Sequence, residues 1–191
     1  GAHQVRVTCD EGQSLAADRV GLPGVGAMRD CMGELKRLGL DTVVKQVADS
    51  GRPLLGVCVG MQAMMDSSAE NDGVECLGIF PGTVEPFGND LRDQFSGELL
   101  KVPHMGWNQV DQTMPHPMWK DIMPDTRFYF VHSYYVQPAG PEPVAGSVVY
   151  GFPIVAAIAK DNIFAVQFHP EKSAQAGLQL YANFVQWDGQ L

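Results

Sequence analysis

The stretch "GVCVG", residues 56 to 60, places a cysteine between two glycines directly after the apolar run "PLL". A nucleophile on a sharp turn between a strand and a helix needs small residues two positions before and after it, because the turn brings those positions together. The start of the following helix also directs partial positive charge at the sulfur, which favours a thiolate. Cys58 is therefore a candidate nucleophile, although a glycine-rich turn with an inert buried cysteine has the same pattern.

A nucleophilic cysteine needs a base, and the candidate is His169 in "QFHPEKS". Pro170 biases His169 toward an extended conformation, in which residues two apart point to the same side. Glu171 then reaches the imidazole, fixes its tautomer and stabilises its protonated form, as the third member of a triad does. For the tripeptide alone, a surface histidine beside a capping glutamate is the alternative. Combined with the cysteine turn, the pattern favours a Cys-His-Glu triad.

The segment "LPGVGAMRD", residues 22 to 30, predicts a strand, a glycine-rich turn and a helix. It lacks the third glycine of a dinucleotide-binding fingerprint. Its exposed amides can instead form half of an oxyanion hole, with the N–H of Val59 as the other half. A structural turn is the alternative. We favour the oxyanion hole because an acyl transfer through a cysteine requires one.

Two further residues are ambiguous from the pattern alone. His132, in "FYFVHSYYV", fits a core or substrate-adjacent histidine better than a second base. Trp107, in "MGWN", fits either the core or an interface, where tryptophan is a common anchor.

The elements that must position these residues alternate in the first half of the chain. Strands are predicted at 4–8, 18–22 and 53–58, and helices at 26–39, at 41–50 and from "MQAMMDSS" (61–68). Such alternation is typical of parallel βαβ units. From residue 77 to about 136 the pattern becomes β, "KDN" (160–162) predicts a hairpin turn, and 173–187 predicts an amphipathic helix. Residues 1–191 therefore read as one α/β domain.

Composition excludes several classes of protein. A net charge of −9 argues against binding to a nucleic-acid backbone. No apolar stretch approaches the roughly 20 residues that span a bilayer, and the start is unlike a signal peptide. The four cysteines are too widely spaced for a zinc site, and reduced thiols in a cytoplasmic enzyme are expected. They are Cys9, Cys31, Cys58 and Cys76.

Taken in order, "GVCVGMQ", "FVHSYYV" and "QFHPEKS" resemble the class I glutamine amidotransferases. "LPGVGAMRD" and "KVPHMGWN" narrow this resemblance to the glutaminase subunits of imidazole glycerol phosphate synthases, which act in histidine biosynthesis. The resemblance runs from about Asp18 to the C-terminus. It implies an α/β fold of the flavodoxin-like kind, with a mixed, mostly parallel sheet flanked by helices.

The resemblance also implies an activity, the hydrolysis of glutamine to glutamate and ammonia. Cys58 would attack the side-chain amide, His169 would act as base and then acid, and Glu171 would orient it. The amides of Val25 and Val59 would form the oxyanion hole. The implied substrate-binding positions are Gly24, Gly26, Gln62, Glu70, His132, Ser133 and Tyr134.

The implied partner is a cyclase subunit, with which the chain would form a heterodimer. That subunit would use the ammonia to make imidazole glycerol phosphate and an aminoimidazole carboxamide ribotide. Trp107, Tyr129 and Lys172 match family positions at this interface. Neither a metal nor an organic cofactor is implied, and neither nucleic acid nor membrane is an expected partner.

One feature departs from the family. A strand, a glycine-rich turn and a helix normally precede the segment that matches "GAHQVRVT", so the chain is expected to be N-terminally truncated relative to the family. Two other interpretations of the sequence are a different cysteine hydrolase on the same fold, such as a peptidase or γ-glutamyl hydrolase, and a binding module without catalysis.

Overall fold

A computed structural model describes all 191 residues. Its main sheet has six strands in the order β1-β2-β12-β11-β10-β7. These strands are β1 (Val20–Leu22), β2 (Leu54–Val57), β12 (Ile163–Val166), β11 (Phe152–Lys160), β10 (Val144–Tyr150) and β7 (Asp111–Gln112). Both β2 and β12 are buried along their whole length, as expected for strands in the middle of a covered sheet.

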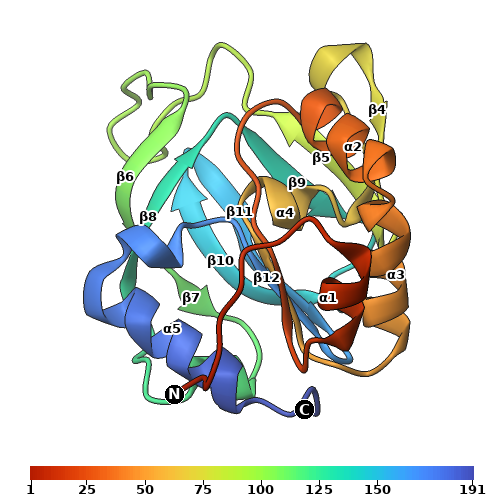
Figure 1. The fold of residues 1–191 in the computed structure, drawn as a ribbon. Coiled ribbons are helices and arrows are strands. Elements are labelled where there is room, and N and C mark those ends of the chain that lie inside the picture. Colours follow the sequence, from red (N-terminus) through yellow and green to blue (C-terminus); the bar gives the residue numbers. More distant parts are fainter.

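Helices cover both faces of this sheet, with α1, α2 and α3 on one side and α5 on the other (Figure 1). Their bounds are α1 (Glu11–Ala16), α2 (Met28–Arg37), α3 (Leu40–Asp49) and α5 (Ala174–Gln186). The apolar stripe expected on α2 is buried through Met28, Met32 and Leu35. Gly39 separates α2 from α3 with a φ of 70°, a conformation that glycine adopts without strain.

Two smaller sheets complete the fold. The first has the order β4-β3-β5-β9, and the second is a two-stranded ribbon of β6 and β8. Their bounds are β3 (Met65–Ser68), β4 (Val74–Glu75), β5 (Phe80–Pro86), β9 (Tyr134–Pro138), β6 (His104–Gln109) and β8 (Arg127–His132). Short helical turns lie at η1 (Glu70–Asp72), η2 (Pro117–Trp119) and η3 (Pro170–Lys172).

The mixed α/β fold is confirmed, but antiparallel pairs outnumber parallel ones. In the main sheet, parallel pairing is confined to β1, β2 and β12. Tight connections at Gly151 and at Asp161–Asn162 join β10, β11 and β12, and connections this short can only link antiparallel strands. The hairpin predicted at "KDN" is therefore present, and the parallel part of the sheet is the part that lies beside Cys58.

Two predicted elements are wrong. Residues 4–8 form no strand, because they have no hydrogen-bonded neighbour, and Val5 and Val7 are exposed. The helix predicted to continue through 61–68 ends after one turn as α4 (Val59–Gln62), and Met65–Ser68 forms β3 instead. There, pairing of β3 with both β4 and β5 outweighs the helical preference of the methionines.

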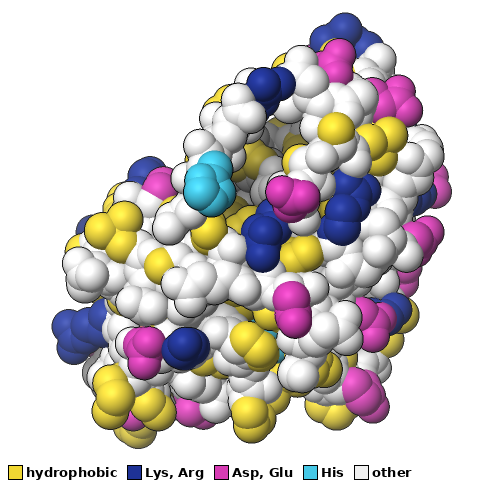
Figure 2. Space-filling model, turned by 60° about the horizontal axis from the view of Figure 1, so that its bottom comes forward, with side chains coloured by type: hydrophobic (Ala, Val, Ile, Leu, Met, Phe, Trp, Pro, Cys, Tyr) yellow, Lys and Arg dark blue, Asp and Glu magenta, His cyan; other side chains and the backbone are white.

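Acidic and basic side chains share the face of the molecule drawn in Figure 2. On the face drawn in Figure 2, basic side chains are interspersed with acidic and hydrophobic ones rather than joined in a continuous stripe. No helix of the chain combines the length and the hydrophobicity needed to cross a membrane.

Candidate active site

Cys58 occupies a strained turn between β2 and α4. Its φ of 53° and ψ of −111° lie outside the regions that residues with a side chain normally adopt. Such strain persists only where surrounding structure imposes it, and it is concentrated at functional sites. The Cys58 N–H donates to the carbonyl of Val166 at 2.8 Å, which ties the turn to β12.

The flanking glycines are required by close packing across this turn. A Cβ on Gly56 would lie 3.2 Å from the carbonyl oxygen of Gly60 and 3.0 Å from the Cβ of Ala165. The contact between the positions two before and two after Cys58 is thus confirmed. The pattern "GVCVG" encodes the turn because no larger residue fits at either end.

His169 and Glu171 form a close pair. Nδ1 of His169 lies 2.6 Å from Oε1 of Glu171, so the ring donates from Nδ1 when the carboxylate is ionised. The contact is the predicted one, but its local cause differs, since residues 170–172 form the helical turn η3 rather than extended chain. The His169 side chain is buried, whereas that of Glu171 is 47% exposed.

The topology of the main sheet brings this pair to the cysteine. Cys58 follows the last residue of β2, and His169 lies three residues beyond the end of β12. The two strands are adjacent and parallel, with Val57 paired to Val166. Their carboxyl ends therefore meet at one edge of the sheet, which is where open α/β sheets bind ligands.

The resting thiol is protonated. The pKa of Cys58 is raised to about 11, chiefly by burial and to a smaller extent by the charge of Glu171, although the Val59 N–H and the Gln167 side chain act to lower it. A helix of one turn contributes little macrodipole. The expected thiolate is thus absent at neutral pH, and the sulfur must transfer its proton to become a nucleophile.

The glycine-rich loop lies against the cysteine turn. A Cβ on Gly24 would lie 2.7 Å from the Gly60 nitrogen and 2.9 Å from the Cβ of Val59. Gly26 has a φ of 83°, and the Val25 side chain is exposed. The structure therefore brings the loop and Val59 together, as an oxyanion hole formed by both requires.

Glu70 anchors the far end of this loop. Its Oε2 accepts a hydrogen bond from the N–H of Met28, the first residue of α2, at 3.0 Å. Arg29 also donates to the carbonyl of Asn71. A carboxylate at a helix start is stabilising. The Glu70 carboxylate thus caps α2 in this structure, and its substrate-binding role stays a prediction.

The side chains of Gln62 and His132 both contact the backbone carbonyl of Tyr134. Nε2 of Gln62 donates to the Tyr134 carbonyl at 3.0 Å, and Nδ1 of His132 lies 2.8 Å from the same oxygen. The Ser133 carbonyl accepts from the Phe87 N–H. Gln62 and His132 are buried. Burial lowers the pKa of His132 to about 4, so it is neutral at physiological pH and is not a second base.

Trp107, the partly buried Tyr129 and Lys172 form one surface cluster. Trp107 and Tyr129 are directly paired across β6 and β8, with their rings edge to face at 6.0 Å. The Lys172 ammonium lies 5.9 Å from the centre of the Tyr129 ring. Met105, on the same face of β6, is also exposed. The predicted interface residues are thus neighbours on the outer face of the ribbon.

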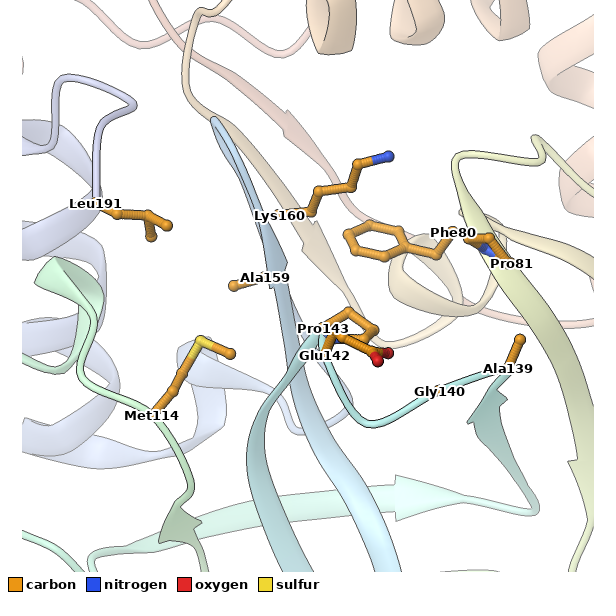
Figure 3. A pocket seen from close by; sticks show the side chains of 10 residues that line it. All are labelled: Phe80, Pro81, Met114, Ala139, Gly140, Glu142, Pro143, Ala159, Lys160 and Leu191. Atoms are coloured by element: carbon orange, nitrogen blue, oxygen red, sulfur yellow. The ribbon is translucent and has the colours of Figure 1, made fainter.

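A separate cavity lies away from these residues. It has a volume of about 630 Å³, and Figure 3 shows Met114 and Leu191 on one side of β11 with Phe80 and Ala139 on the other. The Ala159–Lys160 end of β11 lines this cavity and pairs with the start of β12, whereas His169 follows the end of β12. The cavity is therefore at the opposite edge of the sheet from Cys58. No group of His, Cys, Asp and Glu side chains has the geometry of a metal site.

Two residues near the site were missed by sequence reasoning. Gln167 is fully buried, and its Nε2 lies 3.7 Å from the Cys58 sulfur. Its position two residues before His169 was the available signal, because alternation places both on one side. Ser173 donates to the His169 carbonyl at 2.6 Å and accepts from the Tyr129 N–H, which links η3 to β8. No pattern in the sequence marks Ser173.

Comparison with known proteins gives a consistent result. The family description "Glutamine amidotransferase class-I" matches residues 13–187. "Imidazole glycerol phosphate synthase subunit HisH 1" of Pseudomonas aeruginosa is 56% identical over 99% of this chain and 87% of its own length. "Imidazole glycerol phosphate synthase subunit HisH" of Nitrosococcus oceani is 53% identical over 99% of this chain and 87% of its own length.

Solved structures share the fold at low sequence identity. One described as a glutamine amidotransferase has a TM-score of 0.68 at 14% identity and covers 95% of this chain and 85% of its own. The glutaminase domain of the Trypanosoma brucei protein CTPS, with bound acivicin, has a TM-score of 0.58 at 18% identity, and it covers 92% of this chain and 74% of its own.

Proposed function

The chain belongs to the class I glutamine amidotransferase family, and from this premise we propose that it hydrolyses glutamine to glutamate and ammonia as the glutaminase subunit of an imidazole glycerol phosphate synthase. The single observation that carries the chemistry is the parallel pairing of β2 with β12, whose carboxyl ends lead to the strained turn of Cys58 and to the His169–Glu171 pair. The relatives named HisH carry the assignment to this synthase.

In the proposed mechanism, Cys58 transfers its proton to Nε2 of His169 as the sulfur attacks the side-chain amide carbon of glutamine. The negative charge on the amide oxygen is stabilised by the N–H groups of Val25 and Val59. His169 then gives the proton to the departing nitrogen, which leaves as ammonia. A water molecule, deprotonated by the same ring, cleaves the thioester and releases glutamate.

Glu171 has a supporting role in this scheme. Its hydrogen bond with Nδ1 of His169 leaves Nε2 as the ring atom that exchanges the proton with sulfur. Because its side chain is half exposed, Glu171 stabilises the imidazolium less strongly than a buried carboxylate would.

We further propose that the outer face of the ribbon, formed by Met105, Trp107 and Tyr129 with Lys172, binds the cyclase subunit that consumes the ammonia. Trp107 is exposed and packs against the partly buried Tyr129, over which Lys172 lies, and aromatic side chains grouped with a cation are typical interface anchors. Lys172 follows Glu171 directly, so docking on this face acts one residue away from the proposed triad. Ammonia release is then limited to times when the partner is bound.

The test of the catalytic assignment is ammonia release from glutamine, measured with the cyclase subunit present. Cys58→Ala removes the covalent route, so the rate of ammonia release should fall by several orders of magnitude. Cys9→Ser changes an exposed cysteine outside the site and should leave it intact. Near-normal turnover in Cys58→Ala would overturn the proposed function.

A further inference from the structure

Gln167 lies between the candidate nucleophile and a second buried glutamine. Its Oε1 lies 3.0 Å from Nε2 of Gln62, and its Nε2 lies 3.7 Å from the sulfur of Cys58. The three side chains are buried, with Gln167 at 0% exposure. A buried carboxamide is retained only where its donors and acceptors find partners, so each of its contacts has a definite polarity.

The Tyr134 carbonyl sets that polarity. A carbonyl oxygen only accepts, so the group of Gln62 that lies 3.0 Å from it must be the NH₂ group. The same NH₂ group faces Gln167, which must therefore present its oxygen to Gln62. The NH₂ group of Gln167 is left to face the sulfur. One backbone carbonyl thus orients two side chains and places an N–H donor against Cys58.

A second set of hydrogen bonds holds the same carbonyl in place. Nδ1 of His132 must be protonated to donate to the Tyr134 carbonyl, so its Nε2 accepts from Nδ1 of His104 at 3.0 Å. Nε2 of His104 in turn accepts from Asn108, whose NH₂ group also donates to the Val149 carbonyl. Burial lowers the pKa of His104 to about 3, and that of His132 to about 4. Both rings are therefore neutral at physiological pH, and every donor in this set has a fixed direction.

We propose that Gln167 is a further residue of the catalytic site, whose N–H donor is held by Gln62 against the Cys58 sulfur and favours the thiolate over the thiol. This inference rests on the proposed function of Cys58 as a nucleophile. A donor that faces sulfur gains strength when the sulfur becomes charged, because charge-assisted hydrogen bonds are about twice as strong as neutral ones. It thereby offsets part of the cost of charging a buried thiol. The proton that leaves the sulfur still goes to His169, and the NH₂ group of Gln167 keeps both of its hydrogens.

If Gln167 had only a structural role, its replacement would change the rate of Cys58 alkylation in the opposite direction. The rate of Cys58 alkylation by iodoacetamide, a neutral electrophile, is followed by mass spectrometry of the Cys58 peptide from pH 6 to 9. Loss of a donor to the thiolate slows alkylation, whereas loosening of the core exposes the thiol and speeds it. Glutamine is not used in the assay, so its outcome does not depend on whether the chain is a glutaminase.

Gln167→Met, similar in length but without a donor, should slow alkylation of Cys58 about tenfold across this range, as a rise of about one unit in thiol pKa requires. Gln167→Glu keeps the shape but places carboxylate oxygens near the sulfur, and it should slow alkylation further. Gln62→Met, which frees Gln167 to rotate, should give a smaller decrease. The matched control is Gln112→Met, because Gln112 donates to the Ile122 carbonyl, far from the sulfur in the fold.

Unchanged or faster alkylation in folded Gln167→Met, with the control also unchanged, would overturn the proposal. If that variant fails to fold, Gln62→Met, which releases the same donor without adding a charge, decides the question in the same way. Loss of ammonia release without slower alkylation would count against the donor role while sparing the proposed function. If Gln167→Met slows alkylation but the unmodified chain releases no ammonia from glutamine, the donor role of Gln167 is supported and the proposed glutaminase activity is contradicted.

Discussion

Gly60 lies directly against the carbonyl of Leu22. A Cβ on Gly60 would be 2.0 Å from that oxygen, far inside any real contact, and the obstacle is backbone rather than a movable side chain. The last residue of β1 therefore touches the first turn of α4, which carries the cysteine turn against the loop that contains Val25. The spacing between the proposed nucleophile and the proposed oxyanion loop depends on the absence of one methyl group.

Gly60→Ala should consequently separate the loop from Cys58. We expect glutaminase activity to fall about a hundredfold, since a misplacement of about 1 Å has this effect on catalysis, and the free energy of unfolding to fall by more than about 2 kcal/mol. Steady-state kinetics and urea unfolding measure the two effects. Gly33→Ala is the control, because a Cβ there meets nothing within 4 Å and the residue lies inside α2. It should raise stability by about 0.5–1 kcal/mol.

Glu171→Gln tests whether the carboxylate only orients His169. The amide keeps the size and one acceptor of the carboxylate but loses its charge, so kcat should fall while the fold is kept. The decrease should be smaller than that caused by His169→Ala, which removes the proton carrier itself. Rates of ammonia release and thermal unfolding of the two variants check this. Equal and total losses in two equally stable variants would instead indicate direct proton transfer by Glu171.

The buried histidines predict loss of stability in mild acid. Burial lowers the pKa of His104 to about 3, and of His116 and His132 to about 4. The unfolded chain binds these protons from about pH 6.5 downward, and the folded chain does not. The free energy of unfolding should therefore fall as the pH drops below about 6.5 and level off near pH 3 to 4. Each histidine contributes a slope of at most about 1.4 kcal/mol per pH unit.

His116 allows this slope to be assigned. Its Nδ1 accepts from the Met118 N–H, so Nε2 carries the ring hydrogen, and this buried Nε2 has no hydrogen-bond partner. A second proton would have to add to Nδ1, where it would remove the hydrogen bond from Met118. His116→Phe should reduce the slope of unfolding free energy against pH between 6.5 and 4 by the share of one histidine, at most about 1.4 kcal/mol per pH unit. His3→Gln, at an exposed position, should leave it unchanged. An unaltered slope in His116→Phe, measured by urea unfolding at several pH values, would contradict this assignment.

Lys172→Ala tests the coupling between the proposed interface and the site. The ammonium over the Tyr129 ring stabilises an exposed contact by about 0.5–1 kcal/mol, so its loss should leave the fold intact. We expect weaker binding of the cyclase subunit, or weaker stimulation of ammonia release by it. Alkylation of Cys58 in the isolated chain should change little. Lys45→Ala, on the exposed side of α3, is the control for a lost surface charge. Full stimulation of Lys172→Ala by its partner would rule out this role.

Much of the candidate site could be predicted because its signals are local. The two glycines around Cys58 contact each other across a five-residue turn, so the turn is encoded by its own residues. His169 and Glu171 are two positions apart, and their contact forms even though η3 replaces the extended chain that was expected. The stripe of α2 was likewise readable, because helical periodicity needs no information from the rest of the chain.

The tertiary structure alone decided what depends on strand pairing. Residues 4–8 have a strand-like composition but no neighbour, whereas Met65–Ser68 pairs on both sides and becomes a strand despite its helical pattern. Gln62 and Gln167 are 105 positions apart and meet only because β2 and β12 are adjacent and parallel. A pattern in sequence reports the preferences of neighbouring residues. Contacts between distant ones follow from the order and register of the strands, and that order places a donor on the Cys58 sulfur.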